Sequence, residues 1–249
     1  MAKNSSLFKV EGTLDNVTFY KSADGHFVRT KGGVSKSRIL NDPAFIRTRE
    51  NGAEFGRSAG AGKMLRMASG TMVFKAKDAK LSSRLVQVMS KIKNLDTVSV
   101  RGERNVVEGL LTAEGQQLLR GFDFNNRAPL LSVLFAPFSV DSSTGALEIA
   151  NFTPKEQLNY PVGATHISLR SSFVVLDFAS GVSDVTYSST VNLPIAMATA
   201  TVSLTPSGIP QGSGTRIHLL LIEFFQEVNG EQYSLKNGAY NVLNIVDVV

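Results

Sequence analysis

The sequence TRIHLLLIEFFQEV at residues 215–228 decides the fold of the C-terminal half of the chain, and the pair Asn229-Gly230 follows it directly. An Asn-Gly pair is a strong signal for a two-residue hairpin turn, because both central residues of a type I′ turn need a positive φ. We therefore predict a strand over residues 215–228 that folds back into a second strand at residues 232–235.

The same kind of pattern extends outward from this hairpin across residues 128–249, where apolar residues recur with a period of two and turns are frequent. The other strand candidates lie at residues 130–140, 146–152, 165–178, 185–191, 196–204 and 240–246. Seven or eight short strands within about 120 residues are typical of a β-sandwich. We predict an antiparallel sandwich domain over residues 128–249, immunoglobulin-like or jelly-roll-like, without choosing a topology.

Residues 1–127 have a different pattern and are expected to form a hairpin-plus-helix region. A β-hairpin is predicted within residues 6–34, where Asp24-Gly25 marks the turn. Asp42-Pro43 is typical of a helix start. The clearest helix covers residues 78–93, whose apolar side chains repeat every 3.6 residues, and a shorter one covers residues 112–120. The chain as a whole is predicted to be α+β.

A stripe of glycines interrupts the segment after this helix start. Gly52, Gly56 and Gly60 recur at every fourth position of a segment with helical composition. Each Gly inside a helix costs about 1 kcal/mol relative to Ala. Two interpretations therefore stay open: the helix ends early near residues 60–62, or a close backbone neighbour compensates through tight packing of small residues.

Charge is unevenly distributed along this chain, whose formal net charge is +5. Residues 1–120 contain 21 of the 26 Lys and Arg and 11 of the 21 Asp and Glu, a net of +10, which leaves −5 for the rest. Most of the positive charge lies in residues 21–104. This asymmetry indicates a basic half that meets an anionic surface, or two halves that attract each other within one chain or between chains.

Basic and aromatic residues alternate in the predicted hairpin, and basic residues continue into the helical segment. We expect a partner to be contacted by Tyr20, Lys21, Arg29, Lys31, Lys36, Arg38, Arg47, Arg49 and Arg57. A two-stranded ribbon can enter a DNA groove, and aromatic rings can stack on unpaired bases, so phosphate binding is one interpretation. The other is a solvated basic face, or one that docks on the acidic C-terminal half of the same or a neighbouring chain.

No set of residues carries a recognisable catalytic or metal-binding pattern. The chain has no Cys, and its three histidines are widely separated, without the spacing of metal ligands. Residues 59–64 (AGAGKM) resemble a phosphate loop only weakly, because Met64 stands where that loop has Ser or Thr. We therefore expect no metal, no cofactor and no enzymatic activity.

Targeting signals are not evident in the sequence either. It has no run of about 18 apolar residues, which a membrane-spanning helix would need. The N-terminal residues lack the apolar core of a signal peptide. We expect synthesis in the cytoplasm and no membrane span, and we leave the final location open.

Residues 12–20 (GTLDNVTFY), 31–34 (KGGV) and 42–51 (DPAFIRTREN) resemble the N-terminal signature of uncharacterised proteins of the Bacteroidota. Residues 223–238 are similar to the close of those proteins. The resemblance covers about half of the chain. It implies a lineage rather than an activity, and it assigns no functional residue.

These features favour a non-enzymatic structural protein that assembles with copies of itself, such as a subunit of a virion-like shell, a tube or a filament. Opposite faces that meet head to tail produce rings or filaments. The alternative is a nucleic-acid-binding protein whose basic half, residues 19–104, binds phosphates. A third hypothesis, an enzyme such as a hydrolase, would need Ser, His and a carboxylate to cluster in a pocket.

Overall fold

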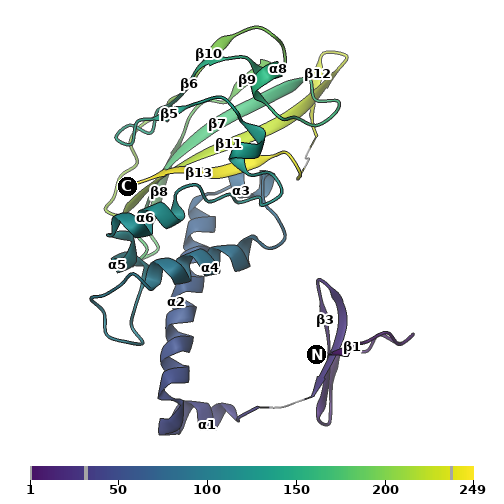
Figure 1. Cartoon of the computed structure of the whole chain (residues 1–249), viewed down its shortest axis with the longest axis vertical. Helices are drawn as coiled ribbons and strands as arrows, with labels where there is room; N and C mark the ends of the chain where they lie inside the picture. The colour runs from purple at the N-terminus through teal and green to yellow at the C-terminus, as the bar shows by residue number, and fades with distance from the viewer. Residues whose placement is uncertain (1, 31–32, 236–237) are drawn as a thin grey trace. The chain divides into compact units, whose positions relative to one another are not determined.

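The structure of the chain is a computed structural model that describes residues 2–30, 33–235 and 238–249. The chain divides into two compact units, Met1–Arg49 and Glu50–Val249. The first unit contains β1 (Ala2–Lys3), β2 (Gly12–Leu14), β3 (Val17–Ser22), β4 (Gly25–Thr30), α1 (Lys36–Asn41) and the 3-10 turn η1 (Pro43–Phe45), after which α2 (Ile46–Ala68) begins (Figure 1).

An antiparallel four-stranded sheet in the order β1-β4-β3-β2 forms most of the first unit. The predicted hairpin is present as β3 and β4, although its turn occupies Ala23 and Asp24, because Ser22 pairs with Gly25. None of the described residues of this unit, 2–30 and 33–49, is buried. The sheet therefore has no core of its own.

The second unit continues α2 and contains most of the chain. Its further elements are α3 (Met72–Lys75), α4 (Leu81–Lys93), α5 (Val106–Leu110), α6 (Ala113–Leu119), α7 (Leu130–Val133), β5 (Ser139–Val140), β6 (Leu147–Phe152), α8 (Pro154–Gln157), β7 (His166–Leu176), β8 (Ser183–Tyr187), β9 (Val191–Pro194), β10 (Ala200–Leu204), β11 (Thr215–Val228), β12 (Glu231–Ser234) and β13 (Val242–Val248).

Strand β11 is the centre of a six-stranded antiparallel sheet. It pairs with β7 on one side and with β13 and then β12 on the other, while β8 and β9 pair with the outer side of β7. The turn between β11 and β12 has positive φ at both Asn229 (54°) and Gly230 (81°), which confirms the Asn-Gly prediction.

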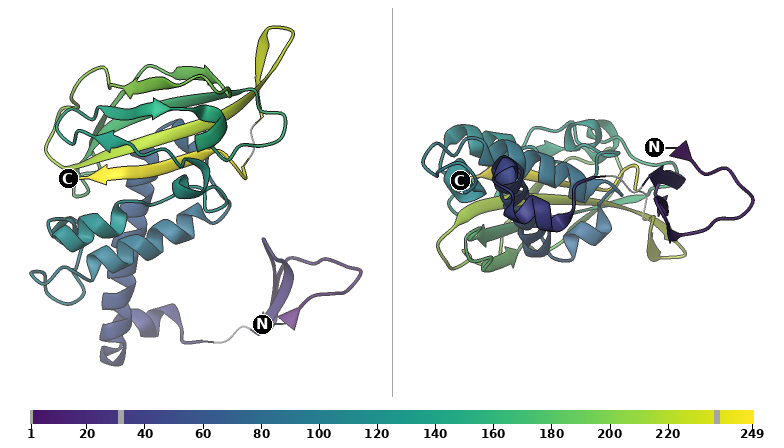
Figure 2. Two further views of the ribbon diagram at one scale, coloured as in Figure 1. Left: turned by 45° about the horizontal axis from the view of Figure 1, so that its top comes forward. Right: turned by 90° about the horizontal axis from the view of Figure 1, so that it is seen from below.

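Both faces of this central sheet are covered within the second unit. On one face lies a smaller sheet of β5, β6 and β10, and the core between the two sheets includes Phe152 and Phe224. On the other face lie α2, α4, α5 and α6, and this second core includes Leu65, Leu85 and Leu219 (Figure 1, Figure 2). The predicted α+β class and C-terminal antiparallel sandwich are confirmed, and the helices form a third layer.

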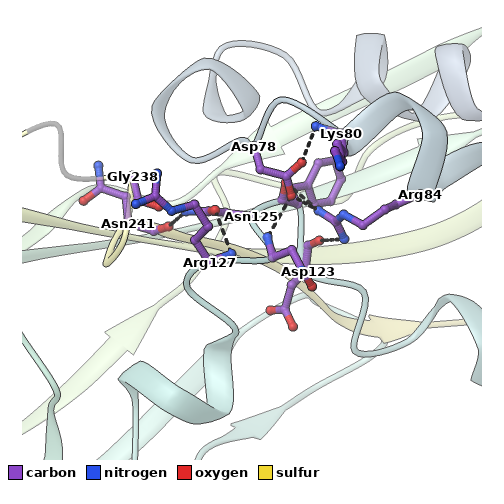
Figure 3. A network of polar contacts seen from close by, with 10 residues as sticks. Asp78, Lys80, Arg84, Asp123, Asn125, Arg127, Gly238 and Asn241 are labelled. Carbon is purple, nitrogen blue, oxygen red and sulfur yellow. Dashed lines mark hydrogen bonds and ion pairs between the residues drawn. The ribbon is translucent and has the colours of Figure 1, made fainter. Parts of the chain in front are cut away.

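The sequence predicted a domain boundary between residues 127 and 128, whereas the division into compact units falls between Arg49 and Glu50. A polar network explains why residues 50–127 belong with the sheet (Figure 3). Arg84 on α4 donates hydrogen bonds to the carbonyl oxygens of Asp123 (2.8 Å) and Phe124 (3.0 Å), and the side chain of Asn125 donates to the carbonyl of Asn241 (2.8 Å). The helices are thereby tied to the segment that leads into the sandwich.

Candidate interaction surfaces

The predicted contact residues of the N-terminal sheet divide between its two faces. Residues directly opposite each other in an antiparallel pair share a face. Arg29 and Tyr20 lie on one face, where the Arg29 guanidinium is 5.4 Å from the centroid of the Tyr20 ring, and that ring stacks on Phe27 at 5.9 Å. Lys21 lies on the other face, opposite His26. The expected set is therefore not one continuous surface.

Arg38 and Arg49, which we expected to contact a partner, make contacts within the helical part of the first unit instead. Arg38 forms an ion pair with Asp42 at 3.0 Å and lies 5.7 Å from the centroid of the Phe45 ring. Arg49 donates hydrogen bonds to the carbonyl oxygens of Ile39 (2.7 Å) and Asp42 (3.0 Å). These side chains hold the turn between α1 and α2.

Arg57 has a comparable role in the second unit, where it donates two hydrogen bonds to the carbonyl oxygen of Gly102, at 2.7 and 2.9 Å. Lys36 and Arg47 are exposed, and Lys31 lies outside the described residues. A guanidinium that binds backbone carbonyls has fewer donors left for phosphate. The structural contacts of these arginines thus add nothing to the nucleic-acid hypothesis, which stays a prediction.

The glycine stripe does not break α2, which runs without interruption from Ile46 to Ala68. A Cβ atom added at Gly52, Gly56 or Gly60 would meet no described atom within 4 Å. The tight helix contact lies at Gly62 instead, where an added Cβ would be 3.3 Å from the Cβ of Leu85 on α4. Among the described residues, no group packs against the three glycines of the stripe.

One side of the N-terminal sheet carries a patch of four apolar side chains, none of which is fully buried. Leu14 lies opposite Val17, and Phe19 lies opposite Val28, so these four side chains share a face, which we call the apolar sheet face. Leu14 is 70% exposed and the other three are half-buried. The same side of the sheet continues with Lys21 and His26, and the opposite side combines Thr18 and Arg29 with the stacked rings of Tyr20 and Phe27. The apolar sheet face is therefore a patch on one side of a sheet whose two sides both carry polar and apolar groups.

A cavity of about 780 Å³ opens in the second unit where the end of α2 meets α3 and the start of α4. Its lining combines the cations Lys63, Arg66 and Lys77 with the apolar Met67 and Phe74, which are 69% and 74% exposed. We call it the basic cavity. Its volume lies in the range of known ligand sites, about 300 to 1,000 Å³. The cavity is suited to a group that is both acidic and apolar.

The carboxylate of Asp78, which also lines the basic cavity, does not cancel this positive charge. Asp78 forms an ion pair with Arg84 and accepts hydrogen bonds from the backbone N–H groups of Lys80 (2.6 Å) and Asn126 (2.9 Å) (Figure 3). Burial acts to raise the pKa of Asp78, but the backbone donors and Arg84 outweigh it and keep this pKa below its ordinary value. The negative charge is already engaged by these partners.

The hairpin of β11 and β12 extends past the rest of the central sheet (Figure 2). Strand β7 pairs with β11 only as far as Phe225, so residues 226–234 form a two-stranded extension, which we call the acidic hairpin. It contains Glu227 and Glu231 and neither Lys nor Arg. Val228 (46% exposed), Glu231 and Tyr233 (55% exposed) share one face, where the Tyr233 hydroxyl donates to Glu231 at 2.7 Å. The sequence predicted this hairpin but gave it no functional role.

A serine, a histidine and a carboxylate do come together in the second unit, at residues that the sequence did not single out as a set. His218 and Asp247 are buried cross-strand neighbours on β11 and β13. The hydroxyl of Ser142 donates to Asp247 at 2.5 Å, and Asp247 also forms an ion pair with Arg120. An activated serine would donate to the histidine instead. This cluster therefore has the geometry of a structural network.

Among residues 2–30, 33–235 and 238–249, no group of three or more His, Asp or Glu is arranged to hold a metal ion. No described helix combines the length and apolar character needed to cross a bilayer. No family model, curated protein or solved structure matches the chain. A function must therefore be inferred from the apolar sheet face, the basic cavity and the acidic hairpin.

Proposed function

We propose that this protein is a non-enzymatic structural subunit that assembles with copies of itself into a shell, a tube or a filament. In this proposal the first unit completes its core against a second copy of the chain. The observation that carries the proposal is the absence of any buried residue among the described residues of the first unit, although its sheet has an apolar face.

A sheet with an apolar face needs a second layer. Stable domains bury such a face against another sheet or against helices, and a small sheet without this layer is marginal in water. Burying a side chain such as Phe19 or Val28 contributes about 1.5 to 3 kcal/mol. Leu14 would gain most of this amount, and the half-buried Val17, Phe19 and Val28 would gain part of it, so the four side chains together favour association.

A second copy of the same face is the partner that we favour. Two identical faces related by a two-fold axis form an isologous interface, in which each apolar side chain meets the other copy's apolar face. Sheets that pack face to face lie about 10 Å apart, and their inner side chains interdigitate. Polar residues of the opposite face, such as Thr13 and Thr18, stay in solvent in this arrangement.

Chemical crosslinking of the full chain tests this arrangement, because the chain contains no Cys and a single introduced Cys reports on one position only. We expect a short bismaleimide to link two copies of the Phe19→Cys variant. The matched Thr18→Cys variant, on the neighbouring residue of the opposite face, should remain uncrosslinked. Equal crosslinking of the two variants would show that the sheet does not associate through its apolar face.

Light scattering after size-exclusion chromatography tests the assembly itself. We expect the mass of the full chain to exceed that of a monomer at high protein concentration. Phe19→Lys should lower this mass, whereas Thr18→Lys should not, because only Phe19 lies on the apolar sheet face. A wild-type chain that stays monomeric at every concentration and salt level would refute the proposed function.

A further inference from the structure

An isologous interface joins only two copies, so an extended assembly needs a second, different interface. We propose that the acidic hairpin of one copy inserts into the basic cavity of a neighbouring copy. This inference rests on the proposed function and adds the contact through which dimers would be linked into a larger assembly.

Charge complementarity is the first argument for this pairing. The cavity presents Lys63, Arg66 and Lys77. The face of the hairpin that carries Tyr233 presents Glu231, and Glu227 adds a second carboxylate on the other face. Opposite potentials on two surfaces steer their encounter and fix the orientation in which they meet. The pairing also gives a role to the uneven charge of the chain, since the cavity belongs to the basic segment and the hairpin to the acidic half.

Both surfaces also carry exposed apolar groups beside their charges. Met67 and Phe74 stand in the cavity, and Val228 and Tyr233 stand on one face of the hairpin. Aromatic side chains that fill a pocket supply most of the energy of many interfaces, while charged groups at the rim supply specificity. Tyr233 is the side chain best suited to enter the cavity, with Glu231 close enough to reach its lysines.

The cavity is ordered before a partner arrives. Arg66 donates a hydrogen bond to the hydroxyl of Ser82 at 2.8 Å, which links α2 to α4. The ammonium of Lys77 lies 4.6 Å from the centroid of the Phe74 ring, so this cation and its apolar neighbour form one surface. Groups that are already in place lose less conformational entropy when they bind.

The hairpin is held in position at its base. The hydroxyl of Thr165 accepts a hydrogen bond from the backbone N–H of Glu227 at 2.7 Å, and the side-chain amides of Asn192 and Gln232 exchange hydrogen bonds at 2.9 and 3.1 Å. A fixed hairpin that extends past its sheet is a suitable projection for a neighbour's cavity. Cavity and hairpin are different parts of one unit, so their contact can be heterologous, and a heterologous contact propagates from copy to copy.

A charge exchange in the full chain tests the pairing, with light scattering as the readout. We expect Lys77→Glu and Glu231→Lys each to weaken association by about tenfold, because each places like charges in contact. The double variant, which restores opposite charges, should recover most of the lost affinity. Lys91→Glu on α4 and Glu148→Lys on β6 make the same charge changes at exposed positions outside both surfaces and should have little effect.

The outcomes separate this inference from the proposed function. If wild type and both charge variants assemble equally while Phe19→Lys does not, the hairpin–cavity contact is wrong and the sheet contact stands. Weakening by Lys77→Glu alone, without an effect of Glu231→Lys, would mean that another part of the neighbour, or another acidic ligand, occupies the cavity, and would overturn the assignment of the hairpin. The assignment of the hairpin would also be wrong if the double variant lost as much association free energy as the two single variants together.

Discussion

The carboxylate of Glu54 on α2 lies 2.5 Å from the ammonium of Lys93 on α4, and these side chains are only 7% and 12% exposed. Glu54 also accepts a hydrogen bond from the backbone N–H of Gly102 at 2.8 Å. The hydrogen bond from Lys93 is the main reason why the pKa of Glu54 lies below its ordinary value. One carboxylate thus joins two helices and a loop.

Removal of one partner from this buried pair should strongly destabilise the second unit. We expect Lys93→Met to lower the free energy of unfolding by about 3 kcal/mol, because the Glu54 charge would stay buried without its cation. Urea denaturation followed by circular dichroism measures the change. Lys91→Met, on the exposed side of the same helical turn, should change this free energy by less than about 0.5 kcal/mol. Similar losses in the two variants would show that the ion pair does not stabilise the helices.

We expect the ionised carboxylate of Asp96, in the loop after α4, to contribute a stabilisation that acid removes. Burial would raise the pKa of Asp96, but its carboxylate accepts backbone hydrogen bonds from Val98 (3.0 Å), Ser99 (2.8 Å) and Asn105 (3.0 Å), and the pKa falls to about 2. Since this pKa is lower in the folded chain than in the unfolded chain, the stabilisation is complete above about pH 4 and is lost as the pH falls toward 2.

We therefore expect Asp96→Ala to cost about 1 to 2 kcal/mol of unfolding free energy at neutral pH, allowing for screening by solvent. The difference between this variant and wild type should shrink as the pH approaches 2. Urea midpoints measured from pH 7 to pH 2 test this expectation. A difference that stays constant over the whole range would show that Asp96 contributes through packing rather than through its charge.

Two glycines on different helices should respond to the same substitution in opposite directions. An added Cβ at Gly56 on α2 meets open space, so Gly56→Ala should stabilise the chain by as much as about 1 kcal/mol. An added Cβ at Gly109 on α5 would lie 2.1 Å from the carbonyl oxygen of Ile92, so Gly109→Ala should destabilise it. Thermal unfolding of dilute protein measures both. If Gly56→Ala lowered the stability, another group would have to pack against the glycine stripe.

Local signals in the sequence predicted the regular elements well. The Asn229-Gly230 turn needs no distant residue to form, and the expected helix at residues 78–93 appears as α4, with Leu81, Leu85 and Ile92 buried as its periodicity predicted. Residues 130–140 were predicted to be a strand, and this was wrong for the most part, because Leu130–Val133 form α7, Leu134 forms only an isolated bridge, and the strand is confined to Ser139–Val140. The backbone N–H of Leu130 donates to Asp123, a tertiary contact at 2.9 Å that no local pattern reveals.

The candidate surfaces differ in how far the sequence predicts them, because some follow from a local pattern and others depend on tertiary packing. The apolar sheet face follows from the hairpin pattern once Phe19 and Val28 are known to be opposite each other. The basic cavity could not be predicted, because Lys63 and Lys77 come together only through the packing of α2, α3 and α4. The arginines looked equivalent in the sequence, yet Arg49 and Arg57 turned out to bind backbone carbonyls.

We expect the chain to become less stable in mildly acidic solution because His218 on β11 is buried. Its ring is buried, with its centroid 4.3 Å from that of Phe173, and Asp247 lies opposite it on β13. Burial lowers the pKa of His218, although the nearby carboxylates of Asp247 and Asp141 act in the opposite direction and Arg216 acts with burial. The unfolded chain therefore takes up this proton more readily than the folded one, and stability falls as the pH drops below about 6.5.

We expect His218→Leu to flatten the pH dependence of the melting temperature between about pH 7.5 and pH 5.5, because the variant has no ring to protonate at this position. Differential scanning calorimetry of the full chain at these two pH values measures the effect. The control is His166→Leu, which removes the histidine that lies 3.5 Å from Glu227 at the base of the acidic hairpin. That variant also loses one imidazole but keeps the ring at residue 218, so a flattening seen only in His218→Leu identifies the buried ring as its source. A His218→Leu chain that loses as much stability on acidification as wild type would show that other groups cause the loss.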